Sequence, residues 1–244
     1  MTLTHGQAVQ RLAVALDVSA REAALDLVRR LAGHVGVVKV GLEAFTAHGP
    51  AFVADVHAAG VPVFLDLKLH DIPNTVERAA RNCARLGVRL LTVHAGGGEA
   101  MLQAARAGAE GGTPAGSERP RIIAVTVLTS LDEAALAALD LPGGTLARAL
   151  RWGGIARRSG CDGVVCSPHE AAALRAATAP DFLLVTPGIR PAGEASGDQK
   201  RVATPAAALA AGADLLVVGR PITGSADPAA AADAIVAELC GGAA

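Results

Sequence analysis

The part of the sequence richest in residues for acid–base chemistry spans positions 64 to 75 and reads FLDLKLHDIPNT. If its first half is a β-strand, Asp66 and Lys68 share a face, because alternate residues of a strand point the same way. Asp71 follows three residues later. Burying such charges is costly unless they are paired, and a buried lysine readily gives or takes a proton. We therefore predict that Asp66, Lys68 and Asp71 are catalytic; an ordinary salt bridge at a strand end is the alternative.

A second acid and a second amine stand near the ends of the two preceding apolar runs, at Asp17 and Lys39. We expect both to reach the same site, with an unrelated ion pair as the alternative. Ammonium groups cannot ligate a metal ion, so two amines among the carboxylates make a poor site for a hard cation. The predicted chemistry therefore uses no metal and no cofactor.

Two segments late in the chain have the composition of a phosphate site. One is PGIR, from Pro187 to Arg190, and the other is the dipeptide Gly219-Arg220. Glycine lets the backbone approach an anion, and arginine can bind it with two parallel N–H groups. Barrel enzymes often bind phosphate after their seventh and eighth strands. The alternative for Arg220 is a surface arginine in a loop.

The elements that would position these residues are short apolar strands alternating with Ala-rich helices. Near-continuous apolar runs indicate strands covered on both faces, as in a parallel sheet. Polar residues follow almost every run, which favours a closed (β/α)8 TIM barrel, an α/β fold of one domain spanning residues 1–244, over an open doubly wound sheet. The eight predicted strands are Leu12–Asp17, Val35–Gly41, Val61–Lys68, Leu90–Ala95, Arg121–Leu128, Gly163–Ser167, Phe182–Gly188 and Leu215–Arg220.

Helix and loop signals lie between these strands. Ser19 and Glu22 have the spacing of a capping box at the start of the first long helix, and Pro73 suits the first turn of another. Residues 108–120 are expected to be a surface loop. The long Gly-rich segment 187–205 after the seventh strand fits a lid over a site.

Composition excludes several classes of function. Hydrophobic residues make up 51% of the 244 residues, aromatic residues 2%, and the net charge is −1. The charge gives no reason to expect a nucleic-acid partner, and no apolar stretch is long enough to span a membrane. The four cysteines form no C-x-x-C pair and are expected to be reduced thiols of a cytoplasmic protein.

The segment from Asp66 to Thr75 resembles the D-x-K-x-x-D signature of the orotidine 5′-phosphate decarboxylase family, with its H-D-I-P-N-T continuation. The segments VKVGL (38–42), TVHA (92–95), VTVLTS (125–130), PGIR (187–190) and GDQKR (197–201) are similar to that family in the same order. The resemblance covers about Leu12 to Thr223. Leu69 stands where an aromatic residue is common in the family, and we expect it to face away from the charges.

The resemblance implies decarboxylation of orotidine 5′-phosphate to uridine 5′-phosphate by a homodimer with sites shared across the interface. It assigns Asp66, Lys68 and Asp71 to the catalytic charge network, with Lys68 as the cation beside C6 and the proton donor. The implied binding roles are Asp17 and Lys39 for the ribose, Thr129 for the pyrimidine, Asp71, Ile72 and Thr75 for the partner subunit's site, and Pro187, Arg190, Gln199, Gly219 and Arg220 for the phosphate end.

Two rival functions remain open from the sequence. The D-x-K-x-x-D core also occurs in Mg²⁺-dependent sugar-phosphate lyases of the same superfamily, such as 3-keto-gulonate 6-phosphate decarboxylase and hexulose phosphate synthase. Those enzymes lack the H-D-I-P-N-T and G-D-Q-x-R segments. A catalytically silent phosphate-binding barrel is the second rival, against which the retention of every charged group argues.

Overall fold

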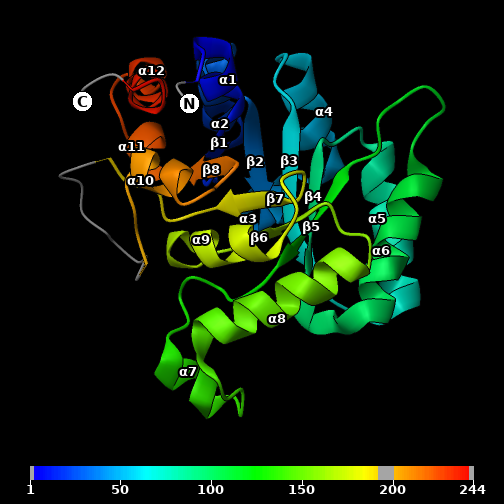
Figure 1. The fold of residues 1–244 in the computed structure, drawn as a ribbon. Helices are drawn as coiled ribbons and strands as arrows, with labels where there is room; N and C mark the ends of the chain where they lie inside the picture. The colour runs from blue at the N-terminus through cyan, green and yellow to red at the C-terminus, as the bar shows by residue number, and fades with distance from the viewer. Residues whose placement is uncertain (1–2, 192–200, 242–244) are drawn as a thin grey trace.

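Eight parallel strands pair in chain order, and β8 returns to pair with β1, so that the sheet closes into a barrel (Figure 1). The computed structural model describes residues 3–191 and 201–241. The predicted (β/α)8 barrel is confirmed, and the open sheet is excluded because an open sheet has two unpaired edges. The strands are β1 Leu12–Ala15, β2 Val37–Gly41, β3 Val63–Leu69, β4 Leu90–His94, β5 Arg121–Val125, β6 Gly163–Val165, β7 Leu183–Thr186 and β8 Leu215–Val218.

Helices surround the barrel, and among those described none combines the length and apolar character needed to cross a lipid bilayer. Pro73 occupies the first turn of its helix, as predicted. The helices are α1 His5–Gln10, α2 Arg21–Leu31, α3 Leu42–His48, α4 Pro50–Ala58, α5 Pro73–Arg85, η1 Ala95–Gly97, α6 Gly98–Gly112, α7 Glu133–Ala138, α8 Gly144–Arg158, α9 Pro168–Ala177, α10 Pro205–Ala210, α11 Arg220–Thr223 and α12 Pro228–Leu239.

Two apolar layers hold the barrel together, because every strand has one face toward the helices and one toward the barrel axis. On β1, Leu12 and Val14 belong to the outer layer, whereas Ala13 and Ala15 face the interior. The inner layer is small and almost purely aliphatic, since few aromatic residues are available. Its buried members are Ala13, Ala15, Val37, Phe64, Leu90, Ile123, Val185, Leu215 and Val217.

Helices α5 and α6 lie closely side by side (Figure 1) because glycines remove side chains from their contact. A Cβ atom at Gly108 would lie 2.1 Å from the backbone oxygen of Glu77, and one at Gly112 would lie 2.2 Å from that of Arg81. Both distances are far shorter than any real carbon–oxygen contact. The backbones can therefore approach only where these two positions are glycine.

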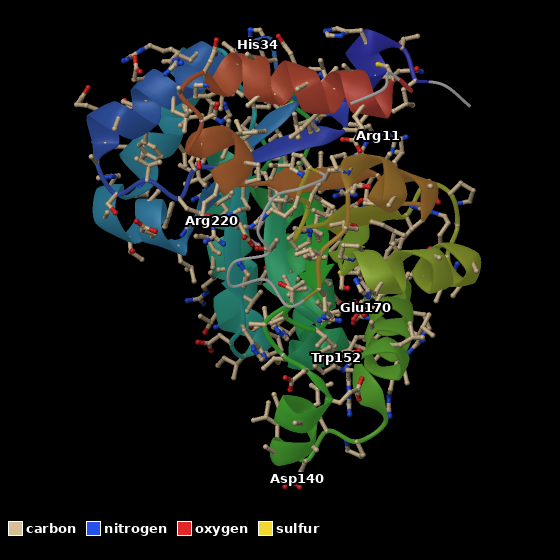
Figure 2. All side chains as sticks on the ribbon, turned by 90° about the vertical axis from the view of Figure 1, so that its left-hand side faces the viewer. Arg11, His34, Asp140, Trp152, Glu170 and Arg220 are labelled. Atoms are coloured by element: carbon tan, nitrogen blue, oxygen red, sulfur yellow. The ribbon has the colours of Figure 1, made fainter. Side chains whose placement is uncertain are left out.

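Two predicted local features are wrong. The Ser19 hydroxyl donates to Glu43 instead of capping α2, whose N-cap residue is Ala20 and has no side-chain cap. The predicted loop 108–120 begins later, because α6 continues to Gly112 and packs against α5. The segment that contains α7, between β5 and β6, projects from the barrel, with Asp140 at its tip (Figures 1 and 2).

Candidate active site

Asp66 and Lys68 lie at the end of β3 and form an ion pair, with 2.8 Å between Lys68 Nζ and Asp66 Oδ2. The backbone at this point is irregular. Lys68 has a φ of 51°, in the left-handed region that residues other than glycine rarely adopt. The pairing of β3 with β4 shifts register between Leu65 and Leu69. Despite this irregularity, both charged side chains line one cavity.

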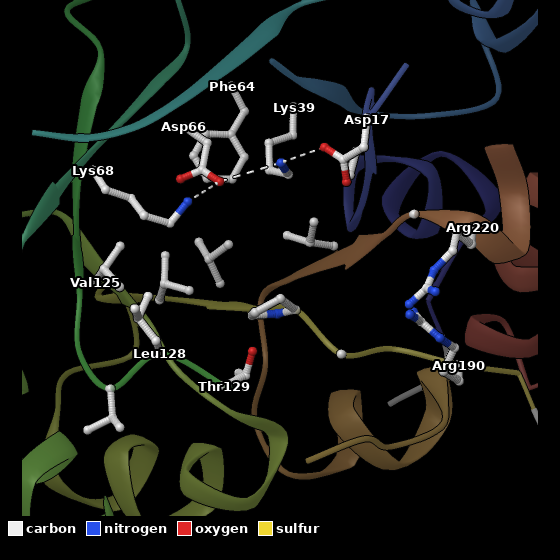
Figure 3. A pocket seen from close by; sticks show the side chains of 18 residues that line it. Asp17, Lys39, Phe64, Asp66, Lys68, Val125, Leu128, Thr129, Arg190 and Arg220 are labelled. Atoms are coloured by element: carbon white, nitrogen blue, oxygen red, sulfur yellow. Dashed lines mark hydrogen bonds and ion pairs between the residues drawn. The ribbon is translucent and has the colours of Figure 1, made fainter. Parts of the chain in front are cut away.

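Lys39 extends this pair into a chain of alternating charges (Figure 3). Its Nζ atom lies 3.5 Å from Asp66 and 3.5 Å from Asp17. Burial of Asp66 would raise its pKa, but the nearby ammonium groups of Lys39 and Lys68 and two hydrogen bonds outweigh that effect and hold the pKa below its usual value. Asp66 is therefore an anion at neutral pH, held between two cations.

Thr92 on β4 is a site residue that the sequence reasoning did not assign. Its buried hydroxyl donates to Asp66 Oδ1 at 2.9 Å and accepts the backbone N–H of Lys68, also at 2.9 Å. One side chain thus fixes both the carboxylate and the distorted backbone of its lysine partner. The signals in the sequence were a polar residue between the apolar residues of this strand and its place in the family-like segment TVHA.

The charged chain occupies one end of a cavity of about 290 Å³ at the carboxyl ends of the strands. Inward-facing barrel residues, Ala15, Phe64, Val185 and Val217 among them, form an apolar floor. Thr129 lies on the cavity wall between the two ends (Figure 3). An apolar floor strengthens the electrostatic interactions above it, because they are less screened than in water.

Two arginines form the opposite end of the cavity. The guanidinium groups of Arg190 and Arg220 point toward one another there (Figure 3), with Pro187 and Gly219 also in the lining. Gly188 has a φ of 80°, so the turn after β7 needs glycine. Arg190 is 9% exposed, and its Nη1 donates to its neighbour's carbonyl oxygen at 2.8 Å. Paired guanidinium groups at the mouth can bind a dianion such as phosphate.

Three predicted site residues do not reach this cavity within the chain. Asp71, Ile72 and Thr75 are all exposed, and Ile72 retains 66% of its accessible surface. Asp71 accepts the N–H of Ile72 at 2.6 Å, whereas α5 begins at Pro73 and has no side-chain cap at its N-cap residue, Ile72. Asp71 lies two residues before Pro73, where it could cap α5, but it makes no capping hydrogen bond to that helix. Gln199, the remaining predicted residue, lies outside the described residues.

His94 ends β4 but does not line the cavity. Its ring stacks on that of His70, with 5.1 Å between centroids, and meets Trp152 edge-on at 5.7 Å. Its Nδ1 accepts the backbone N–H of Gly96 at 3.1 Å. Burial, His70 and the Lys68 ammonium together lower the pKa of His94, so a neutral ring supports the wall beside Lys68.

Comparison with known proteins decides the family. The profile of the "Orotidine 5′-phosphate decarboxylase / HUMPS family" matches residues 10–235. The chain belongs to this family. It is 56% identical over 230 residues to the orotidine 5′-phosphate decarboxylase of Anaeromyxobacter sp. (strain K), covering 94% of this chain and 98% of that protein. It is 54% identical over 234 residues to that of Moorella thermoacetica, covering 95% and 93%.

Solved structures support the same assignment to the orotidine 5′-phosphate decarboxylase family. The crystal structure of orotidine 5′-phosphate decarboxylase from Lactobacillus acidophilus superposes with a TM-score of 0.84 at 41% identity, covering 93% of this chain and 98% of that one. The family match from residue 10 to 235 includes both ends of the cavity, from Asp17 to Arg220. The expected family is therefore confirmed over the whole site.

The cysteines of this family member do not contribute reactive thiols to the cavity. Cys83, Cys161 and Cys166 are buried, and none of the four cysteines lines the cavity. Burial raises the pKa of Cys83 to about 11 and those of Cys161 and Cys166 to about 12. These thiols stay protonated at neutral pH and are poor nucleophiles.

Proposed function

We propose that this chain removes CO₂ from C6 of orotidine 5′-phosphate and produces uridine 5′-phosphate. The observation that carries the proposal is the division of one cavity into two charged ends across an apolar floor. One end holds alternating acids and amines, and the other holds two guanidinium groups. A nucleotide with an anionic carboxylate on its base and a phosphate on its ribose needs a cation at each end.

Lys68 performs the chemical step. The bond between C6 and the carboxylate carbon breaks, the electron pair stays on C6, and CO₂ leaves. The pyrimidine has no conventional electron sink for that pair, so the ammonium group beside C6 stabilises it and then donates a proton to it. The resulting amine regains its proton from solvent. Asp66 orients the ammonium group through their 2.8 Å contact.

The other cavity residues bind the substrate. Asp17 and Lys39 contact the ribose hydroxyls and Thr129 the pyrimidine. The backbone at Pro187 and Gly219, together with the Arg190 and Arg220 guanidinium groups and Gln199, binds the phosphate. The phosphate is remote from C6, and its binding energy lowers the barrier by holding the base against Lys68.

The active unit is a homodimer in which each subunit completes its partner's site. The supporting observation is the exposed row formed by Asp71, Ile72 and Thr75 at the start of α5. A large apolar side chain such as Ile72 that is 66% exposed gains free energy when a second subunit covers it. Asp71 then joins the charge network of the neighbouring cavity. The enzyme works in the cytoplasm as one domain over residues 1–244, without a metal or a cofactor.

The test of the function is the fall in ultraviolet absorbance when purified protein meets orotidine 5′-phosphate, with and without EDTA. Equal activity in both samples is expected. Turnover that EDTA abolishes would overturn the metal-free mechanism. No turnover in either sample would overturn the proposed function in favour of a sugar-phosphate lyase or a silent phosphate-binding barrel. Lys68→Ala is expected to abolish turnover while the circular dichroism spectrum stays unchanged. Activity of that variant within about tenfold of wild type would overturn the role of Lys68.

Subunit mixing tests the shared site separately. Lys68→Ala and Asp71→Ala are each expected to be inactive. A mixed dimer has one site with both lesions and one with neither. Exchange should therefore restore roughly a quarter of wild-type activity per subunit, because half the dimers are mixed and half their sites are intact. Sedimentation checks that subunits exchange; exchange without recovered activity would overturn the shared site.

A further inference from the structure

Arg201 is the first described residue after the gap that follows β7, and it contacts two other parts of the barrel. Its Nη1 forms an ion pair with Glu170 Oε1 on α9. Its Nη2 donates to the carbonyl oxygen of Leu128 at 3.1 Å. Leu128 precedes Thr129, and both line the cavity on the side assigned to the base. One guanidinium group thus joins the segments that follow β5, β6 and β7.

The residues directly after Arg201 pair with the phosphate end of the cavity. The N–H of Arg190 donates to the carbonyl oxygen of Ala203 at 3.0 Å, and the N–H of Ala203 donates to that of Gly188 at 3.2 Å. Ile189 and Ala203 form an isolated parallel bridge. The backbone that carries Arg190 is therefore held by a strand-like segment whose first anchor is the Arg201 side chain.

Glu170, the anionic partner, is itself held rigidly. It is 1% exposed, and its second oxygen, Oε2, accepts the N–H of Ser167 at 2.9 Å within the capping box of α9. Figure 2 marks Glu170 and Arg220 on the barrel from the side of the molecule on which α9 and α10 lie. A buried ion pair contributes little net stability, because desolvation of both charges offsets their attraction. The ion pair between Arg201 and Glu170 is therefore more informative about the geometry of the site than about the stability of the fold.

We infer that Arg201 is a positioning residue that fixes the separation between the phosphate end and the base end of the cavity. This inference rests on the proposed function, since the two ends are named from that substrate. A nucleotide bound at both ends needs a fixed separation between Leu128–Thr129 and Gly188–Arg190. A nucleoside without phosphate engages only the base end and does not depend on that separation.

The decisive variant is Arg201→Lys, assayed on orotidine 5′-phosphate and on orotidine. A lysine can keep the ion pair with Glu170 but has no planar fork with which to reach the Leu128 carbonyl oxygen as well. We expect kcat/KM for orotidine 5′-phosphate to fall by about tenfold or more, and kcat/KM for orotidine to change by less than about twofold. The melting temperature should stay close to that of wild type.

Arg175→Lys is the matched control. Arg175 lies on α9, and its guanidinium group contacts Asp214 and the carbonyl oxygens of Gly212 and Phe182. These contacts are at the opposite end of the barrel from the cavity. This substitution should lower the melting temperature and leave kcat/KM for both substrates unchanged. The control therefore distinguishes the general effect of losing a structural arginine from the loss of the fixed separation between the two ends of the cavity.

Each outcome is informative. Equal losses on both substrates, or no loss on either, would overturn the positioning role of Arg201. If Arg201→Lys does not fold, the double variant Arg201→Met/Glu170→Gln avoids an unpaired buried charge and keeps the capping oxygen; it must show the same selective loss. A wild-type protein that does not decarboxylate orotidine 5′-phosphate would instead overturn the proposed function, which makes the two failures distinguishable.

Discussion

The hydroxyl of Thr92 donates a hydrogen bond to Oδ1 of Asp66 across the pairing of β3 with β4, at 2.9 Å. The other carboxylate oxygen of Asp66 faces the Lys68 ammonium. A single carboxylate is thus held from two sides, by a neutral donor behind it and a cation in front. Thr92 therefore belongs to the machinery that orients Lys68, although it does not line the cavity.

We expect Thr92→Val to reduce kcat while KM changes little. Valine has nearly the same shape but leaves Asp66 Oδ1 and the Lys68 N–H without their buried partner, at a cost of about 1–3 kcal/mol each. Steady-state kinetics measure the effect, and Thr92→Ser, which keeps the hydroxyl, is the control. Similar kcat values for Thr92→Val and wild type would show that Asp66 needs no second anchor.

The depressed pKa of Asp66 predicts how stability depends on pH. Its folded-state pKa lies below the unfolded value of about 3.9. The ionised group therefore stabilises the fold above that pH, and this stabilisation is lost as the pH falls through the folded pKa. Urea unfolding should show a larger difference between wild type and Asp66→Asn at about pH 6 than at about pH 3. Asp26→Asn, at an exposed position on α2, is the control for the effect on stability of replacing an aspartate in general. A difference that is constant with pH would contradict the assignment.

Arg220→Ala should lose the part of its activity on orotidine 5′-phosphate that depends on hydrogen bonds between Arg220 and the phosphate. Charge-assisted hydrogen bonds contribute about 1.5–3 kcal/mol each, so kcat/KM for orotidine 5′-phosphate should fall at least about tenfold. Orotidine should be a poor substrate for wild type and hardly poorer for the variant. An equal penalty from removing the phosphate in both proteins would show that Arg220 does not bind that group. Added guanidinium ion is expected to restore part of the loss.

Gly108→Ala should destabilise the fold, because its Cβ would lie 2.1 Å from the backbone oxygen of Glu77. Overpacking of this kind costs about 1–3 kcal/mol. Gly111→Ala is the matched control on the same helix: its Cβ meets the flexible end of Arg81 at 3.4 Å, and alanine is the better helix former. Thermal unfolding should place Gly108→Ala below wild type and Gly111→Ala level with or above it. The reverse order would refute the close backbone approach.

Sequence patterns were sufficient for the barrel and for the residues that each strand delivers to its mouth. Strand periodicity placed Asp66 and Lys68 on one face, and the order of strands placed Arg220 at the phosphate end. These predictions depend only on alternation along one strand and on parallel pairing. Six predicted strands run past the observed ends, and several of their last residues leave the sheet to line the cavity, as Asp17 and Gly188 do. The other two, β2 and β3, begin two residues later than predicted, and β3 continues one residue further, to Leu69.

Contacts between different elements could not be predicted in this way. The hydrogen bond from Thr92 to Asp66 joins two strands, and neither strand reveals it by itself. Ser19 has the spacing of a cap for α2, but the N-cap position falls one residue later, at Ala20, and the Ser19 hydroxyl donates to Glu43 of α3. Asp71 is exposed in one subunit, so its proposed role depends on a second copy of the chain. Local rules fail where a distant partner offers the stronger interaction.

The left-handed backbone at Lys68 has a consequence for the balance between stability and function. Holding a residue other than glycine at that φ costs about 1–3 kcal/mol. Glycine would relieve that strain, but it would also remove the ammonium group that pairs with the buried Asp66 carboxylate. The proposed proton donor thus occupies a strained backbone position, and the ion pair with Asp66 opposes the loss of this lysine even where selection acts on stability alone.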